Sequence, residues 1–282
     1  MTDQVTRDNK PMTDAQLKAV AIANINTTDT SSPTTTYPTE IVQLPSKGKL
    51  YPEGHPLKGG TIEMKYMTAK EEDILTNQSF ISNGVVLDKL FQALIVTPCD
   101  YNDLTLGDKN AIMIAARVLG YGKDYPIKVT SPTSGDDIEY TADLTKLGDK
   151  EIDWSLHTGE NSFKLDLPAS KRTVTVSILT QRIQKKIDAE LKGLAKLKRN
   201  AATTTMLKHL ITAIDGETDN VAVRKFVENN LLAIDSRAIR TFIKSITPDI
   251  DLSIEIPDGE SGDTFRSSLN IGLDFFWPDA EL

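Results

Sequence analysis

Apolar residues recur along the chain with two spacings, one typical of helices and one typical of strands. The helical spacing occurs in two blocks that are separated by strand-like alternation. In the first block it predicts helices over 69–77, over 85–96 and from Asp108 to Gly120 or Gly122. In the second block it predicts helices over 179–199, 204–213, 221–229 and 236–246.

Alternating apolar and polar residues predict the strands. Thr61–Met67 is interpreted as a half-buried strand, and residues 125–142 as a hairpin whose turn is the sequence SPTSGDD. Residues 163–168 and 172–179 are interpreted as further strands or a loop, and the alternation returns after Asp251. The predicted fold class is α+β, with two helical blocks that are each followed by a β-hairpin.

Several helix ends carry side chains that cap a helix. Thr68 precedes a helical pattern with Glu71 three residues on, which predicts a capping box. Asp108 is the predicted N-cap of its helix, and Asp235 or Ser236 caps the last one. The sequence IDG at Ile214–Gly216 ends the helix predicted over 204–213.

Composition divides the chain into three parts. Residues 1–40 are rich in Thr, Ser, Asp and Asn, so we expect a flexible N-terminal arm that buries too little apolar surface to fold. A short helix over Asp14–Ile25 that docks on a partner is the alternative. We predict an N-terminal α+β domain over 41–178 and a helical C-terminal domain over 179–282, with a terminal hairpin and the tail sequence FFWP.

Overall composition excludes several classes of protein. No apolar run approaches the length of roughly 18–20 residues that a membrane span requires. The segment from Thr2 to Lys10 is polar, so we expect no secretory signal. The net charge of −8 opposes non-specific binding of nucleic acid. A single cysteine, Cys99, excludes an internal disulfide and favours a reducing compartment.

The helix predicted over 179–199 carries the densest charge of the chain. Its basic residues surround a narrow apolar stripe, and Asp188 and Glu190 interrupt them. One interpretation is a surface that binds an acidic partner, and the other is a solvated helix face. The candidate partner-binding residues on this helix are Arg182, Lys185, Lys186, Lys192 and Lys196.

The C-terminal tail contains an aromatic cluster, Phe275, Phe276 and Trp277, followed by Pro278. Aromatic side chains gain much free energy on burial and are enriched at interface hot spots. The cluster therefore either folds back into the core of this chain or anchors a partner, and all four residues are candidates for partner binding.

The sequence offers few groups for chemistry. His55, His157 and His209 are not spaced as metal ligands, and Cys99 has no neighbouring histidine. Carboxylate pairs such as Asp136 and Asp137 are typical of hairpin turns. No phosphate-binding loop, nucleophile elbow or dinucleotide-binding motif is present. These residues give no argument for an enzyme, and we predict no catalytic residue, no metal ligand and no cofactor.

The order of several short motifs resembles one family. These are LPSKGKLY before a strand, MTAKEEDIL, ISNGVV, the turn over 103–108, RVLGYG, the hairpin with SPTSG, IDG and terminal FFWP. Together they resemble the baseplate hub proteins and hub assembly factors of contractile-tailed, T-even-like bacteriophages, over roughly Ile41 to Pro278.

One departure from the family pattern concerns metal. Relatives often carry a Cys-Pro-x-Cys-Gly knuckle in the first hairpin and a second cysteine pair in the C-terminal hairpin. The corresponding positions here read Ser131–Gly135 and Ile256–Gly259. Serine and aspartate do not replace thiolates in a structural zinc site, so we predict a metal-free turn held by Pro132 and Gly135.

The resemblance implies a non-enzymatic role in assembling the central hub of the tail baseplate, through contacts with other phage baseplate hub or tail proteins. Contacts with nucleic acid and insertion into a membrane are not expected. A permanent structural component of the virion baseplate or tail is the alternative, and a hydrolase is the third. The implied location is the host cytoplasm during assembly, with the virion tail baseplate as the second possibility.

Overall fold

The computed structural model describes residues 37–198, 201–258 and 263–276. The elements described below all belong to one compact unit, which begins at Pro38. Its α-helices are α2 (Ala69–Leu75), α3 (Gln78–Ser82), α4 (Val86–Leu94), α5 (Leu106–Tyr121), α6 (Gln181–Lys196), α7 (Ala202–Leu210), α8 (Asn220–Asn229) and α9 (Ala233–Ile246). Short 3-10 helices are η1 (Pro56–Gly59), η2 (Tyr101–Asp103), η3 (Leu144–Lys146), η4 (Trp154–Leu156) and η6 (Leu273–Phe276).

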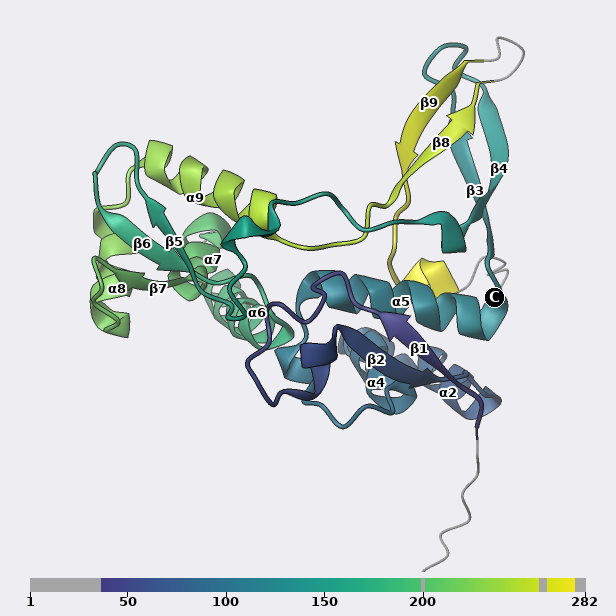
Figure 1. Cartoon of the computed structure of the whole chain (residues 1–282). Helices are drawn as coiled ribbons and strands as arrows, with labels where there is room; N and C mark the ends of the chain where they lie inside the picture. The colour runs from purple at the N-terminus through teal and green to yellow at the C-terminus, as the bar shows by residue number, and fades with distance from the viewer. Residues whose placement is uncertain (1–36, 199–200, 259–262, 277–282) are drawn as a thin grey trace, which may run out of the picture. The chain divides into compact units, whose positions relative to one another are not determined.

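The strands form small antiparallel sheets (Figure 1). β1 (Thr39–Gln43) pairs with β2 (Thr61–Lys65), and β3 (Asp124–Thr130) pairs with β4 (Asp137–Asp143). The one three-stranded sheet of the described residues has the order β5 (Phe163–Asp166), β6 (Thr173–Val176), β7 (Ile211–Ile214). β8 (Ser253–Pro257) pairs with β9 (Thr264–Ser268). Helices and hairpins follow one another as predicted, and the fold class α+β is confirmed.

Three helices begin with a buried carboxylate at their third residue. In α2 this residue is Glu71, which completes the predicted capping box with Thr68. In α5 and α9 it is Asp108 and Asp235, and the N-caps are Thr105 and Leu232. The prediction that Asp108 and either Asp235 or Ser236 act as N-caps is wrong. The helix dipole favours an acid anywhere in the first turn, so the sequence pattern fits both positions.

The segment predicted as the end of a helix over 204–213 is a strand. α7 stops at Leu210, and residues Ile211–Ile214 form β7 beside β6. The two isoleucines and Thr212 are β-branched, which favours the extended backbone. Pairing with β6 satisfies their backbone groups, and the contact partner is far away in sequence, so helical periodicity did not reveal it.

Strand β1 begins slightly before the predicted boundary at residue 41. Thr39 and Glu40 already belong to it, and its register aligns Thr39 with Lys65. Residues 1–36 of the predicted arm lie outside the described residues, and so does the alternative helix over Asp14–Ile25.

Buried apolar side chains form two clusters. The first is built by the β1–β2 hairpin and α2 to α5, and it also takes in Leu269, Phe275 and Phe276 from the end of the chain. The second is built by β5 to β7 and by α7 to α9, with Leu50 added from the N-terminal part. Both clusters therefore contain residues from each predicted domain, and independent folding of 41–178 and 179–282 stays a prediction.

The first turn of α5 joins these two parts of the molecule. Its backbone exchanges hydrogen bonds with the start of α6, from Leu106 N to Leu179 O and from Gln181 N to Leu104 O, at 3.2 and 2.8 Å. Gly107 lies against the chain that follows α9, where a β-carbon would stand 2.0 Å from Pro248 O. Only glycine permits this close approach of two backbones.

The same turn also holds the loop between β1 and η1. The Asp108 carboxylate accepts hydrogen bonds from Ser46 N at 3.0 Å and from the Tyr51 hydroxyl at 2.6 Å. Burial raises the pKa of Asp108 and also that of Tyr51. Both side chains are buried, so their mutual hydrogen bond replaces the water that each has lost.

The β3–β4 and β8–β9 hairpins lie side by side (Figure 1), and hydrogen bonds to Asp258 connect them. Ser131 Oγ donates to Asp258 Oδ1 at 2.6 Å and accepts from Thr133 N and Ser134 N. Gly135 follows with a φ of 79°, which closes the turn as predicted. Hydrogen bonds from Ser131 and Thr133 hold the pKa of Asp258 below its usual range.

Replacing Gly107 with alanine should destabilise the protein. The new methyl group would collide with Pro248 O, and overpacking of this kind lowers the free energy of unfolding by about 1–3 kcal/mol. Urea unfolding followed by circular dichroism measures the change. The matched control is Gly193→Ala in α6, where a β-carbon meets nothing within 4 Å, and helix propensity predicts a gain of about 0.5–1 kcal/mol. Equal stability of both variants would contradict the close approach at Gly107.

Replacing Ser131 with alanine should loosen the contact between the two hairpins. The variant removes the donor to Asp258 and the acceptor for the amides of Thr133 and Ser134. We expect faster hydrogen exchange at these two amides and in β8. The control is Thr130→Ala, whose hydroxyl bonds only within the first hairpin, to Asp137. Unchanged exchange in the Ser131 variant would show that the contact does not hold the hairpins together.

Candidate protein-binding surfaces

Phe275 and Phe276 lie in the core of this chain. Both side chains are 0% exposed. Phe276 packs against Phe91 of α4 with ring centroids 6.4 Å apart, and Phe275 packs against Tyr125 of β3 at 4.8 Å. Of the two alternatives for the aromatic cluster, folding back into the chain's own core therefore describes these two residues. They present no surface to a partner in this structure.

A buried arginine fixes the position of these aromatic residues. Arg117 of α5 donates from Nε to Phe275 O at 3.1 Å. Its guanidinium also lies over the rings of Tyr121 and Tyr125, with the carbon 5.1 and 5.8 Å from the centroids. The charge thus remains inside the fold because a carbonyl and two π-systems surround it. Trp277 and Pro278 lie outside the described residues, and their role in partner binding stays a prediction.

Helix α6 places its predicted basic residues on one exposed face. Ile187 is buried on the opposite side. Counting 3.6 residues per turn, the basic side chains fall within about half a turn of one another, with Ala189 and Gly193 between them. The exposed face comprises Arg182, Lys185, Lys186, Ala189, Lys192, Gly193 and Lys196.

Arg182 and Lys185, the first two cations of this face, form ion pairs with acidic side chains of the same chain. Arg182 contacts Asp100 and Asp103, each at 2.7 Å. Lys185 lies 3.5 Å from Asp88, donates to Asn102 and stands over the ring of Tyr101. They fasten α6 to η2 and α4, so their charges are largely neutralised locally.

The remaining three cations differ from these. Lys186, Lys192 and Lys196 are exposed, and among the described residues no ion pair or hydrogen bond is recorded for their ammonium groups. Leu197 follows them and is 69% exposed. The C-terminal half of α6 therefore combines unpaired positive charge with an exposed apolar side chain. We call Lys186, Lys192 and Lys196 the free basic face.

Glu190 fixes the side of α6 that faces α7 and α8. It contacts Lys208 and His209 at 2.9 Å each and Arg224 at 3.3 Å. Burial alone would raise its pKa, but the hydrogen bonds from Lys208 and His209 and the charges of Lys208 and Arg224 lower it to about 2. Glu190, one of the two acids that interrupt the basic residues of α6, therefore holds this helix against α7 and α8.

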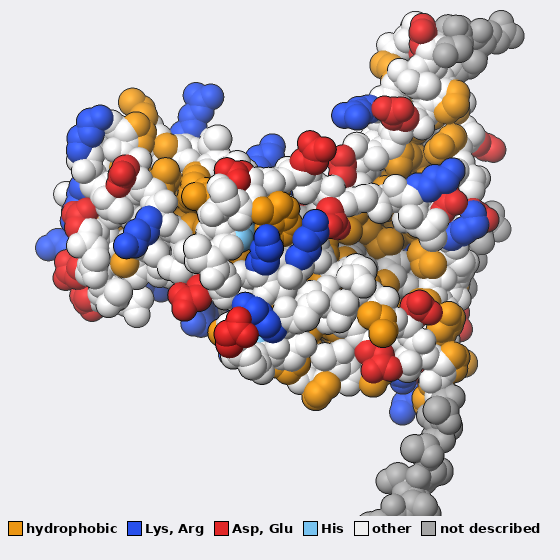
Figure 2. All heavy atoms as spheres, in the orientation of Figure 1, with side chains coloured by type: hydrophobic (Ala, Val, Ile, Leu, Met, Phe, Trp, Pro, Cys, Tyr) orange, Lys and Arg blue, Asp and Glu red, His pale blue; other side chains and the backbone are white. Residues whose placement is uncertain are grey.

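Charge on the face drawn in Figure 2 is mixed. Basic and acidic side chains are interspersed on it, with small apolar areas between them. Interspersed charges of both signs give no extended field of one sign. A charge-directed contact on such a face must therefore use a small local group of side chains.

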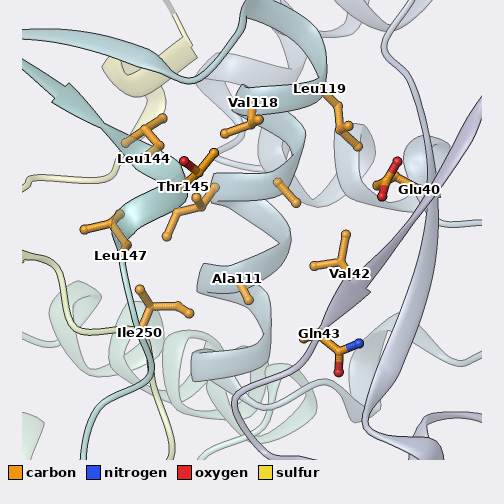
Figure 3. Close-up of a pocket in the computed structure, with 12 residues that line it drawn as sticks. Glu40, Val42, Gln43, Ala111, Val118, Leu119, Leu144, Thr145, Leu147 and Ile250 are labelled. Carbon is orange, nitrogen blue, oxygen red and sulfur yellow. The ribbon is translucent and has the colours of Figure 1, made fainter.

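An apolar groove of about 210 Å³ lies between β1 and α5 (Figure 3). Val42 comes from β1, Ala111 and Val118 come from α5, and Leu144 and Leu147 come from the segment after β4. Glu40 is the single carboxylate among its lining residues. One carboxylate does not provide the acid–base pair that a two-carboxylate hydrolase requires.

The groups considered for metal binding or redox chemistry lie apart. Within residues 37–198, 201–258 and 263–276, no three histidine, cysteine or acidic side chains gather as a metal site. His157 bonds Ile246 O through Nε2, and burial lowers its pKa. Cys99 is half-buried, and burial together with Asp100 and Asp103 raises the pKa of its thiol. A raised pKa disfavours the reactive thiolate.

Sequence comparison assigns the class of protein. A family model described as T4 bacteriophage base plate protein matches residues 36–276. The chain belongs to this family, which confirms the baseplate part of the resemblance. Neither the curated proteins nor the solved structures contain a match. Membership implies contacts with other phage baseplate proteins and a place in the virion tail. Among the described residues, no helix is long and apolar enough to cross a membrane.

Sequence reasoning missed the division of the basic helix. Arg182 finds its acids in a turn some 80 positions earlier, and Lys185 lies beside Asp88 of α4, so composition alone cannot separate them from Lys192 and Lys196. One local signal was available. Asp100 and Asp103 lie close together in the sequence, at the start of the turn predicted over 103–108.

The contact of Glu190 should depend on pH. Its folded pKa of about 2 lies below the ordinary 4.5, so its contribution to stability is complete above pH 4.5 and is lost as the pH falls toward 2. We expect Glu190→Gln to lower the free energy of unfolding at pH 7, by an amount that vanishes near pH 2. Urea unfolding across this range measures it, with Asp188→Asn on the exposed side of α6 as control. A pH-independent difference would contradict the ionic origin.

Proposed function

We propose that this baseplate protein acts in assembling the central hub, by binding an acidic surface of another hub or tail protein through the free basic face of α6. The observation that carries the proposal is the retention of three exposed lysines without acidic partners in a chain whose net charge is −8. Acidic side chains elsewhere in the molecule neutralise the neighbouring Arg182 and Lys185.

Protein is a better partner for this face than nucleic acid. The rest of the chain is negatively charged and therefore repels a long phosphate backbone. A protein partner instead presents its acidic groups over a limited area. Ala189 and Gly193 leave the middle of the face low, so a partner helix can approach it closely. Leu197 supplies apolar contact at one end. The mechanism is surface complementarity without chemistry, and the proposed site of action is the host cytoplasm during assembly.

A permanent component of the baseplate is the second candidate function. Family membership supports it equally, because the family description refers to the base plate itself. The two roles differ in the finished particle. Quantitative mass spectrometry of purified virions gives a fixed copy number for a structural component and no peptide for an assembly factor.

A hydrolase is the third candidate and has the least support. The groove in Figure 3 has one carboxylate, and so has the cavity beside α9, where the acid is Asp249. Family membership also favours a structural rather than an enzymatic role. The test replaces Glu40 and Asp249 with alanine. If either non-enzymatic function is right, tail assembly should be unchanged.

Reversing the free basic face should block assembly without unfolding the protein. In the triple variant Lys186→Glu, Lys192→Glu, Lys196→Glu, we expect about a tenfold or greater loss of infectious particles when it replaces the wild-type chain in an infected host. The reason is repulsion between the new carboxylates and the acidic partner. Thermal unfolding checks that the variant is folded.

The matched control for this experiment is the triple variant Lys70→Glu, Lys89→Glu, Lys225→Glu. It makes the same change of net charge at exposed lysines of α2, α4 and α8. Normal particle yield from this control together with loss from the α6 variant supports the proposal. Equal particle yields from both triple variants would show that the free basic face has no part in assembly.

A further inference from the structure

A cavity of about 460 Å³ opens between the two hydrophobic clusters. Its lining residues come from α4, the first turns of α5, Leu179 just before α6, α7, and the C-terminal half of α9 with the segment that follows it. The apolar lining residues are Leu87, Leu106, Met113, Leu179, Met206, Leu210 and Ile243. The volume falls in the range of roughly 300–1,000 Å³ that is usual for ligand pockets.

The floor of this cavity is apolar and adaptable. Met113 and Met206 line it from α5 and α7, and Leu210 and Ile243 complete it from the second cluster. Met206 and Ile243 are only partly buried, although they lie beside two packed cores. Methionine side chains adjust to differently shaped apolar partners, which suits a surface that receives a side chain from another protein.

The rim of the cavity on α9 is positively charged. Arg240 and Lys244 are exposed, and among the described residues neither forms a recorded ion pair with a carboxylate. Arg240 Nε donates only to Ser236 O of its own helix, at 3.4 Å. Lys109 on the opposite wall is already occupied by Asp88 at 3.0 Å.

One acid on the rim is committed to the fold. Asp249 Oδ1 accepts from Asn110 Nδ2 at 2.9 Å and from the amide of Ile250. Lys150 lies nearby, since its ammonium donates to Lys244 O at 3.0 Å, and its charge also acts on Asp251. Arg240 and Lys244 outnumber this one carboxylate, so the net charge at the rim of the apolar opening is positive.

We propose that this cavity, which we call the α9 pocket, binds an acidic amphipathic helix of a partner baseplate protein, whose apolar side chains enter between Met206 and Ile243 while its carboxylates meet Arg240 and Lys244. Charge complementarity selects this occupant. The pocket has an apolar floor, and Arg240 and Lys244 lie beside it without acidic partners. A helix with apolar residues on one face and acidic residues on the adjacent face is complementary to this arrangement. The inference rests on the proposed function for the nature of the partner, and it adds a second docking site apart from α6.

Methionine methyl NMR tests whether the pocket takes such a segment. The probe is a synthetic helix with leucines on one face and glutamates along its flanks, added to the full chain labelled at methionine methyl groups. We expect the Met113 and Met206 signals to shift on titration. Met64 is fully buried in the first cluster and serves as the internal control, so its signal should stay in place.

Charge reversal tests the orientation of the probe. The variant Arg240→Glu, Lys244→Glu should bind the glutamate helix about tenfold more weakly, and it should gain affinity for a matched helix in which every glutamate is lysine. The control variant Lys70→Glu, Lys225→Glu changes net charge equally at exposed sites outside the pocket and should bind both helices like the wild type.

Three results would overturn the inference: no shift at Met113 and Met206, equal affinity of the wild type for the two helices, or unchanged affinity in the Arg240 and Lys244 variant. None of these measurements involves Lys186, Lys192 or Lys196, and none uses particle yield. Failure of the α9 pocket is therefore distinguishable from failure of the proposed function of α6.

Discussion

The close approach of Gly107 to the carbonyl of Pro248 is the constraint on which the two halves of the structure depend. It brings the segment after α9 against the first turn of α5, where the start of α6 and the loop held by Asp108 also meet. A side chain at position 107 would separate these backbones. Gly107 and Asp249 also line the α9 pocket, so the pocket opens beside this crossing.

Buried carboxylates at the third residue of a helix repeat this joining role elsewhere. Glu71 binds Lys65 of β2 as well as its own N-cap, and Asp235 accepts the amides of Ala169 and Ser170 before β6. The helix N-terminus favours the negative charge, and hydrogen bonds from a second segment offset its lost hydration. Burial by itself raises the pKa of Asp235, but the bonds from Ala169 and Ser170 lower it overall.

Local periodicity was sufficient for elements that bury one regular face. Neighbours in the sequence were enough to predict helix α4, the β8–β9 hairpin and the capping box at Thr68. The role of Asp108, the strand at Ile211–Ile214 and the pairing of Arg182 depend on partners tens of positions away. Composition raised two alternatives for Phe275 and Phe276, and the burial of both rings against Phe91 and Tyr125 decides between them.

A chain with net charge −8 can still bind acidic partners, because contact electrostatics are local. Salt screens charges beyond roughly 8–10 Å at physiological ionic strength, so a docking surface responds to the few side chains nearest to it. Acids at η2 neutralise the start of α6 and leave the end of that helix positive. On α9, Arg240 and Lys244 outnumber Asp249, the single carboxylate among the residues that line the α9 pocket. Internal pairing, rather than the total number of lysines, therefore determines where this protein offers positive charge to a partner.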